Sequence, residues 1–168
     1  MIDIPNLGKA EKNFHLGQTG VGALQLVLIE QGIATAQPWD TFDPAVDLIV
    51  YPNFPDKTGY KTAQIKTKSP WVYEKAQSFT KNQWYTYKSQ VDLIFLICAP
   101  APIQYVEKDS WAGHLYMIDT KTVQVREKTT KDGREMVLID LNNHEPLHKF
   151  KKDGNILKRM SELITEDT

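Results

Sequence analysis

An aspartate and a Gln-x-Lys triplet are the residues of this chain whose types and spacing best suit chemistry. Asp47 opens a short run rich in β-branched residues, and Gln64-Ile65-Lys66 begins 17 positions after it. Both segments have the composition of strands, and side chains two positions apart on a strand share a face. Asp47, Gln64 and Lys66 can therefore converge at a pair of strands, which is the minimum set for metal-assisted hydrolysis of a phosphodiester.

Each of these groups has a definite role in such a reaction. Carboxylate and amide oxygens hold a hard cation such as Mg²⁺ or Mn²⁺. The cation lowers the pKa of a bound water and offsets charge on the phosphate, while a lysine stabilises the negative charge that develops. The alternative is that Asp47 only ends a turn, and that Gln64 and Lys66 lie on the solvated face of an edge strand. The sequence has no Gly-rich phosphate loop, which argues against a nucleotide-driven motor or a kinase.

Length and composition indicate one globular domain over residues 1–168. The chain is 41% hydrophobic and 24% charged, which is ordinary for a folded protein. Its longest apolar run, Leu93 to Ala99, has seven residues and is far too short to cross a bilayer. The first residues lack the pattern of a signal peptide. Cys98 is the single cysteine, so no internal disulfide is possible. We therefore expect a cytoplasmic protein that makes no contact with membranes.

The charge is nearly balanced, at −1, but it is unevenly distributed along the chain. Between Asp56 and Lys88 seven lysines stand against two acidic residues, and the same stretch holds seven aromatic residues. Lysines interleaved with aromatics suit phosphate contacts and base stacking. The alternative is a solvated face over ordinary core aromatics, with Gln83 a plain helix glutamine. The residues expected to contact DNA are Lys61, Lys68, Lys75, Lys81 and Gln83.

The order of expected elements is that of an α/β protein. Helices are expected at 17–32 (capped by Thr19, ended by Gly32), 80–88 (capped by Thr80) and 156–164. Strands are expected at 34–37, 47–51, 60–67, 91–98, 114–118, 122–126 and 135–141, the last after an Asp132-Gly133 turn. Asp92 is interpreted as a residue that starts a strand, and Cys98 as a buried hydrophobe. The pattern predicts a central mixed sheet flanked by helices.

The span from Gly17 to Ile118 resembles the PD-(D/E)XK, or restriction-endonuclease-like, nuclease superfamily. It is most similar to variants with Gln-x-Lys in place of the acid, found in small intron-encoded homing endonucleases and related phage and prokaryotic proteins. Four segments carry the resemblance in the same order as in the family. They are Gly17-Gln-Thr-Gly20 with its helix, the stretch 37–50 around Asp47, Ala63-Gln-Ile-Lys-Thr67, and Val91-Asp-Leu-Ile-Phe95.

The resemblance implies a nuclease core at about 17–118, followed by a β-rich extension and a terminal helix at 119–168. It implies that Asp47, Gln64 and the Ile65 carbonyl bind Mg²⁺ or Mn²⁺, and that Lys66 is the catalytic lysine. DNA is then the substrate, and a homodimer or higher oligomer is expected because a double-strand cut needs two sites.

One departure from the family pattern opens an alternative. The opening helix of the family often carries a glutamate at the metal site, where this chain offers Gln18, Val21 and Gln25 and has no acid until Glu30. Gln18 is the possible contributor from this helix. Loss of that acid favours a catalytically degenerate nuclease-fold protein that binds DNA or another protein. A small-molecule enzyme has no supporting motif.

Overall fold

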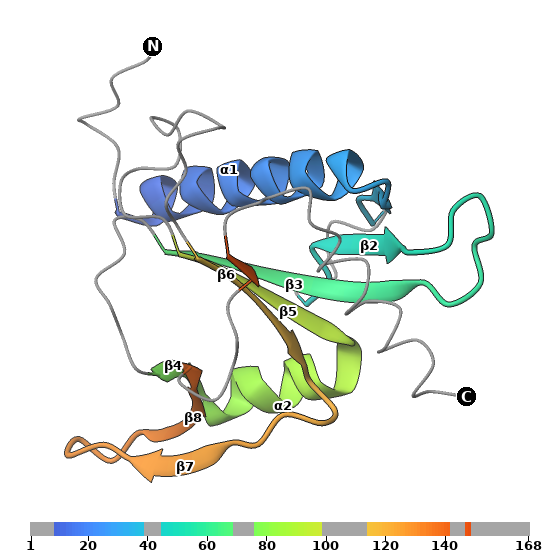
Figure 1. Ribbon diagram of the computed structural model, residues 1–168. Coiled ribbons are helices and arrows are strands. Elements are labelled where there is room, and N and C mark those ends of the chain that lie inside the picture. The colour runs from blue at the N-terminus through green and yellow to red at the C-terminus, as the bar shows by residue number, and fades with distance from the viewer. Residues whose placement is uncertain (1–8, 39–44, 69–75, 99–113, 142–146, 149–168) are drawn as a thin grey trace.

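The computed structural model describes residues 9–38, 45–68, 76–98, 114–141 and 147–148 (Figure 1). Two helices and nine strands lie in these ranges. They are α1 (Lys9–Glu30), β1 (Ala34–Ala36), β2 (Leu48–Tyr51), β3 (Lys61–Lys68), β4 (Ala76–Thr80), α2 (Lys81–Gln90), β5 (Leu93–Cys98), β6 (His114–Asp119), β7 (Arg126–Thr129), β8 (Glu135–Asp140) and β9 (Leu147–His148). No helix in these ranges is long and apolar enough to cross a membrane.

The strands form a large mixed sheet and a small antiparallel one. The large sheet has the order β1-β2-β3-β5-β6-β9, in which only β3 and β5 run parallel to each other. The small sheet has the order β4-β8-β7. The expected α/β class with a mixed sheet is therefore confirmed.

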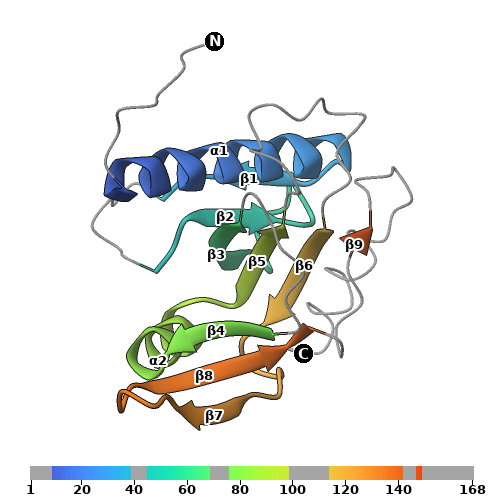
Figure 2. The ribbon, with the colours of Figure 1, turned by 90° about the vertical axis from the view of Figure 1, so that its left-hand side faces the viewer.

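The chain packs in layers around the large sheet (Figures 1 and 2). Helix α1 covers one face, where Leu24 and Leu28 pack with Ile65 and Phe95. Helix α2 and the small sheet cover the other face. The buried residues there form a second core, called the interlayer below: Ala45, Val46, Phe79, Trp84, Tyr87, Val91, Ile94, Leu96, Cys98, Tyr116, Ile118, Val137, Ile139 and Leu141. Strand β5 lies between the two cores, which explains why all six of its residues are apolar and buried.

Several local signals in the sequence act as expected. Thr80 caps α2 in a capping box, in which its hydroxyl accepts from Gln83 N and its own N–H donates to Gln83 Oε1. Gly32 follows α1 with a φ of +79°, a conformation that favours glycine. Cys98 is buried. Asp92 directly precedes β5 and accepts from Thr62 N at 3.0 Å, which agrees with its interpretation as a residue that leads into a strand.

Other expectations need correction. Helix α1 begins at Lys9, eight residues before the expected start at Gly17. The strand expected at 122–126 is wrong, because Thr120 turns the chain by hydrogen bonds to Val91 O and Asp92 O, and β7 starts only at Arg126. Strand β4 was not expected at all. The helix expected at 156–164 lies outside the described residues.

Candidate metal and catalytic site

Asp47 is fixed above the middle of β3 by the pairing of β2 with β3. The two strands run antiparallel with Leu48 opposite Ala63, and Asp47 N donates to Ala63 O at 2.8 Å. This places the Asp47 carboxylate over the next two residues of β3. Its Oδ2 accepts from Ile65 N at 2.8 Å and from Gln64 Nε2 at 2.6 Å. Hydrogen bonds therefore join Asp47 to Gln64 and Ile65, as the sequence predicted for the metal ligands.

Gln64 is a buried residue, with only 5% of its surface exposed. Its Nε2 donates both to Asp47 Oδ2 and, at 3.3 Å, to Ile65 O. Its Oε1 is buried and has no hydrogen-bond partner within the described part of the chain. The alternative of a solvated glutamine on an edge strand is therefore wrong for Gln64. A buried acceptor without a partner costs free energy, so this oxygen needs another explanation.

The three groups have the chemistry and the spacing to hold a hard cation. Oxygen ligands at about 2.0–2.1 Å from Mg²⁺ in an octahedron lie about 2.9 Å from their neighbours. The amide end of Gln64 lies 2.6 Å from Asp47 Oδ2 and 3.3 Å from Ile65 O, which brackets that value. A half-turn of the amide would exchange Nε2 for the partnerless Oε1. Asp47, Gln64 and the Ile65 carbonyl would then present three oxygens to one cation.

The charge of this ligand set is low. Asp47 is its only carboxylate, and the described ranges contain no cluster of three or more His, Cys, Asp or Glu able to hold a metal. Since cation affinity rises with the charge of the ligands, the set fits a weakly held cation. Substrate phosphates would supply the remaining negative charge.

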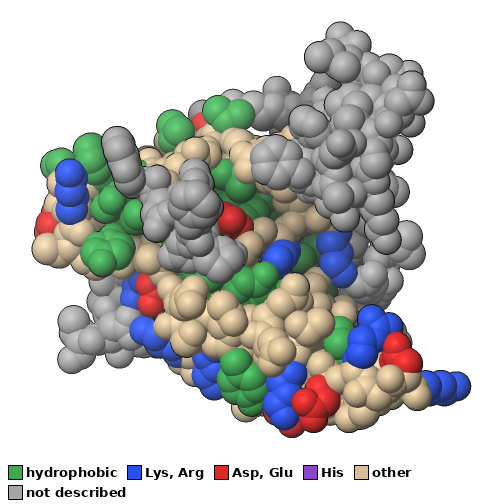
Figure 3. Space-filling model, turned by 180° about the vertical axis from the view of Figure 1, so that it is seen from behind, with side chains coloured by type: hydrophobic (Ala, Val, Ile, Leu, Met, Phe, Trp, Pro, Cys, Tyr) green, Lys and Arg blue, Asp and Glu red, His purple; other side chains and the backbone are tan. Residues whose placement is uncertain are grey.

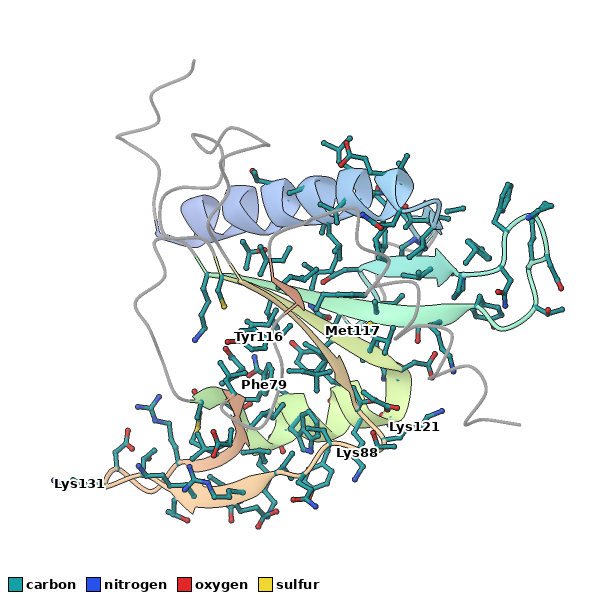
Figure 4. All side chains as sticks on the ribbon, in the orientation of Figure 1. Phe79, Lys88, Tyr116, Met117, Lys121 and Lys131 are labelled. Atoms are coloured by element: carbon teal, nitrogen blue, oxygen red, sulfur yellow. The ribbon has the colours of Figure 1, made fainter. Side chains whose placement is uncertain are left out.

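Lys66 projects from β3 into the interlayer. Gln64, Lys66 and Lys68 pair with Ile94, Leu96 and Cys98 of the parallel strand β5, so all six share one face of the large sheet. Figure 4 shows the same layer, with Phe79 and Tyr116 between the large sheet and α2.

The Lys66 ammonium is half-buried and lies 5.0 Å from the centroid of the Tyr87 ring. Among the described residues this ring is its only partner, with no ion pair and no hydrogen bond. Within the described ranges no acceptor occupies the N–H donors of Lys66, which leaves them open to a ligand.

No model of a known protein family matches this sequence. No curated protein matches it either. The functional interpretation therefore depends on the geometry of the site and on the motifs.

The remaining predicted residues do not join this group. Gln18 is exposed on α1, and no contact joins it to Asp47 or Gln64. Gln83 uses its side-chain carbonyl in the α2 cap, which gives it a structural role that the sequence interpretation missed. Lys61 is 8% exposed, which argues against a direct contact with DNA.

The lysine-rich stretch is split in space. Lys57 lies in the exposed loop between β2 and β3, whereas Lys81 begins α2 and forms an ion pair with Glu135 at 3.8 Å. Lys75 lies outside the described residues. Lys and Arg side chains instead gather along the edge formed by α2 and the small sheet, mixed there with acidic ones (Figure 3). Of the predicted DNA contacts, Lys68 is the one that shares the face of Gln64 and Lys66.

Two residues with polar side-chain groups, Tyr87 in the interlayer and the buried Gln77 on β4, have no site role in the sequence interpretation. Tyr87 was counted only among the aromatics of the lysine-rich stretch. Gln77 lies on β4 beside Phe79, is 7% exposed, and has an Oε1 without a partner in the described ranges. No spacing rule links either residue to β3, because the layers meet only through the fold.

Proposed function

We propose that this chain is a metal-dependent DNA endonuclease with its catalytic site at Asp47, Gln64, Ile65 and Lys66. One observation carries the proposal. The Asp47 carboxylate gathers the Gln64 amide and the Ile65 backbone, while Lys66 leaves the same face of β3 with no acidic partner among the described residues. The order of motifs typical of PD-(D/E)XK nucleases supports the same assignment.

Each residue of the proposed site has its own role in phosphodiester hydrolysis. Asp47, Gln64 and the Ile65 carbonyl would hold Mg²⁺ or Mn²⁺. A cation held there would lower the pKa of a coordinated water and offset charge on the scissile phosphate. Lys66 directs its N–H groups to the phosphate oxygens and stabilises the negative charge that develops there. Lys68, two residues further along the same face, contacts a neighbouring phosphate. A double-strand cut needs two such sites, so the active form is a homodimer or a higher oligomer.

A second candidate is a catalytically degenerate nuclease-fold protein that binds DNA or another protein. It is favoured by the orientation of Gln64, whose Nε2 already satisfies Asp47 Oδ2 without any cation. A site that had lost its metal could keep this pair for structure alone. The single carboxylate in the ligand set favours the same alternative.

Cleavage of a mixed-sequence DNA library with Mg²⁺ or Mn²⁺ separates the two candidates. Asp47→Asn keeps an acceptor for the Ile65 N–H but removes the charge that binds the cation. Asp92→Asn is the matched control, because Asp92 also accepts a backbone N–H of β3, from Thr62, and lies at the start of a neighbouring strand.

Wild type and Asp92→Asn should cut the library, and Asp47→Asn should not. Absence of cutting by the wild type across the library would favour the binding protein. Equal cutting by Asp47→Asn would move the catalytic site elsewhere.

A further inference from the structure

Tyr87 contacts the proposed catalytic lysine, Lys66, but has no role in the mechanism proposed above. Lys66 comes from β3 of the large sheet and Tyr87 from α2 of the opposite layer, and Lys66 Nζ lies 5.0 Å from the ring centroid. An ammonium over an aromatic face is attracted by the negative charge of that face. We propose that Tyr87 is a positioning residue that holds the Lys66 ammonium on the Gln64 side of β3. The inference rests on the proposed function for its catalytic consequence.

The Tyr87 ring is itself held firmly. It is 6% exposed, and it packs on Phe79 in a T-shaped arrangement, with the ring planes at 82° and the centroids 5.7 Å apart. Phe79 in turn stacks on the buried Trp84 at 6.0 Å. The capping box at Thr80 fixes the start of α2, and Val91 N donates to Tyr87 O at 2.8 Å where the helix ends. The ring therefore offers a fixed surface to a long and otherwise mobile side chain.

An aromatic ring suits this role better than a carboxylate would. A carboxylate would accept the N–H groups of Lys66 and compete with a phosphate for them. The ring attracts the charge from one side and leaves the ammonium donors free on the other. It also restricts the rotamers of Lys66 before substrate binds, which is the kind of preorganisation that raises a reaction rate.

The chain offers a conservative variant and a matched control. Tyr87→Phe keeps the ring and removes only the hydroxyl, whereas Tyr87→Leu removes the ring. Tyr85→Leu removes a tyrosine from the same helix that is 49% exposed and donates to Glu127 instead. Circular dichroism and thermal melting of each variant confirm that it is folded before it is assayed.

The first readout does not require activity. Reductive methylation of the lysines with ¹³C-formaldehyde gives each lysine an NMR signal and preserves its charge. The Lys66 signal, assigned with Lys66→Arg, should be shifted upfield by the ring current of Tyr87. Tyr87→Leu should return it to the position of ordinary lysines, while Tyr87→Phe and Tyr85→Leu should leave it shifted.

The second readout is the rate of DNA cleavage in a double-mutant cycle. Tyr87→Leu should slow cleavage by about 10- to 100-fold, and Tyr87→Phe and Tyr85→Leu should not. The effect of Tyr87→Leu should disappear in a Lys66→Ala background, because a positioning residue acts only through the residue that it positions.

An unshifted Lys66 signal in the wild type would overturn the proposal. An equal loss of rate from Tyr87→Leu in the wild-type and Lys66→Ala backgrounds would also overturn it, since that outcome would give Tyr87 a structural role alone. If the wild type cuts no DNA, the nuclease assignment fails. The NMR comparison then decides by itself whether Tyr87 holds Lys66.

Discussion

Gln64 Nε2 lies 2.6 Å from Oδ2 of Asp47, and the same carboxylate oxygen accepts the backbone N–H of Ile65 at 2.8 Å. The loop that leads into β2 is thereby tied to the middle of β3. The amide nitrogen occupies the position in which a cation-binding site would need the amide oxygen. Binding of a metal would therefore require the Gln64 amide to turn, and substitutions at Gln64 can test this requirement.

Gln64→Glu should make the stability of the protein depend on metal. The change places a second carboxylate, at a buried position, beside the half-buried Asp47. Repulsion between the two like charges should cost about 2 kcal/mol or more, or roughly 4–8 °C in Tm. Mn²⁺ should recover this loss, because a ligand that binds only the folded state stabilises it. Thermal melts with EDTA and with Mn²⁺ measure both effects.

The same variant has a predicted pH dependence. Repulsion raises the folded-state pKa of the carboxylate pair above its unfolded value, so the variant is destabilised as pH rises through the unfolded pKa. In EDTA its Tm deficit should therefore shrink below about pH 5. Gln77→Glu is the control, since Gln77 is equally buried but its side chain bonds to Ser78 O and not to Asp47. Equal recovery of Gln77→Glu by Mn²⁺ would show that the metal binds elsewhere.

Lys66→Ala should slow cleavage severely but leave a measurable rate, while the protein stays folded. Loss of one preorganised electrostatic contact at a developing oxyanion costs about 10²–10³ in rate. The stability cost should stay near the value of the ring contact, about 0.5–2 kcal/mol. Ile65→Ala should behave in the opposite way, losing about 2–5 kcal/mol because Ile65 packs in the α1 core. Single-turnover cleavage and urea unfolding of both variants test this contrast. A large loss of stability in Lys66→Ala with little loss of rate, or the opposite in Ile65→Ala, would contradict it.

Lys68→Ala should flatten the salt dependence of DNA binding. Each lost phosphate contact lowers the log–log slope by about 0.9 for duplex DNA. Fluorescence anisotropy titrations without divalent cations measure this slope without cleavage. Lys131, at the turn of the β7–β8 hairpin, is the control because it projects away from the interlayer (Figure 4). The same flattening from Lys131→Ala would place the DNA on the small sheet instead.

Gly20→Ala should destabilise the protein, whereas Gly22→Ala should stabilise it. A Cβ on Gly20 would lie 1.8 Å from Thr67 Oγ1 and 2.9 Å from Thr67 Cβ, and Gly22 has open space at that point. The first change therefore forces α1 away from β3, at about 1–3 kcal/mol or more. The second gains about 0.5–1 kcal/mol of helix propensity. Equal effects in urea unfolding would contradict the close packing of α1 on β3.

Features set by neighbouring residues could be predicted from the sequence. The Thr80–Gln83 capping box and the apolar run of β5 are local patterns, and both occur where expected. The hairpin pairing of Asp47 with Gln64 and Ile65 also followed, because a short connection between two strands favours their pairing.

Features that depend on distant parts of the chain could not be predicted. Strand β4 is short and largely polar, and it pairs with β8, which follows it by more than fifty residues (Thr80 opposite Met136). The contact between Lys66 and Tyr87 likewise requires the packing of two layers. Lys61 is buried because of its place in the large sheet. The alternation of side chains along a strand shows which residues share a face, but it does not show whether other elements cover that face.

Anomalous diffraction from crystals grown with Mn²⁺ tests the metal assignment most directly. With DNA bound to complete the ligand set, the wild type should give an anomalous peak about 2.2 Å from Asp47 Oδ2, with the Gln64 amide turned so that its Oε1 faces the peak. Asp47→Asn crystals should lack that peak. A peak only at other sites, or none near Asp47 at saturating Mn²⁺ with DNA bound, would contradict the assignment of Asp47, Gln64 and Ile65 as the metal site of a nuclease.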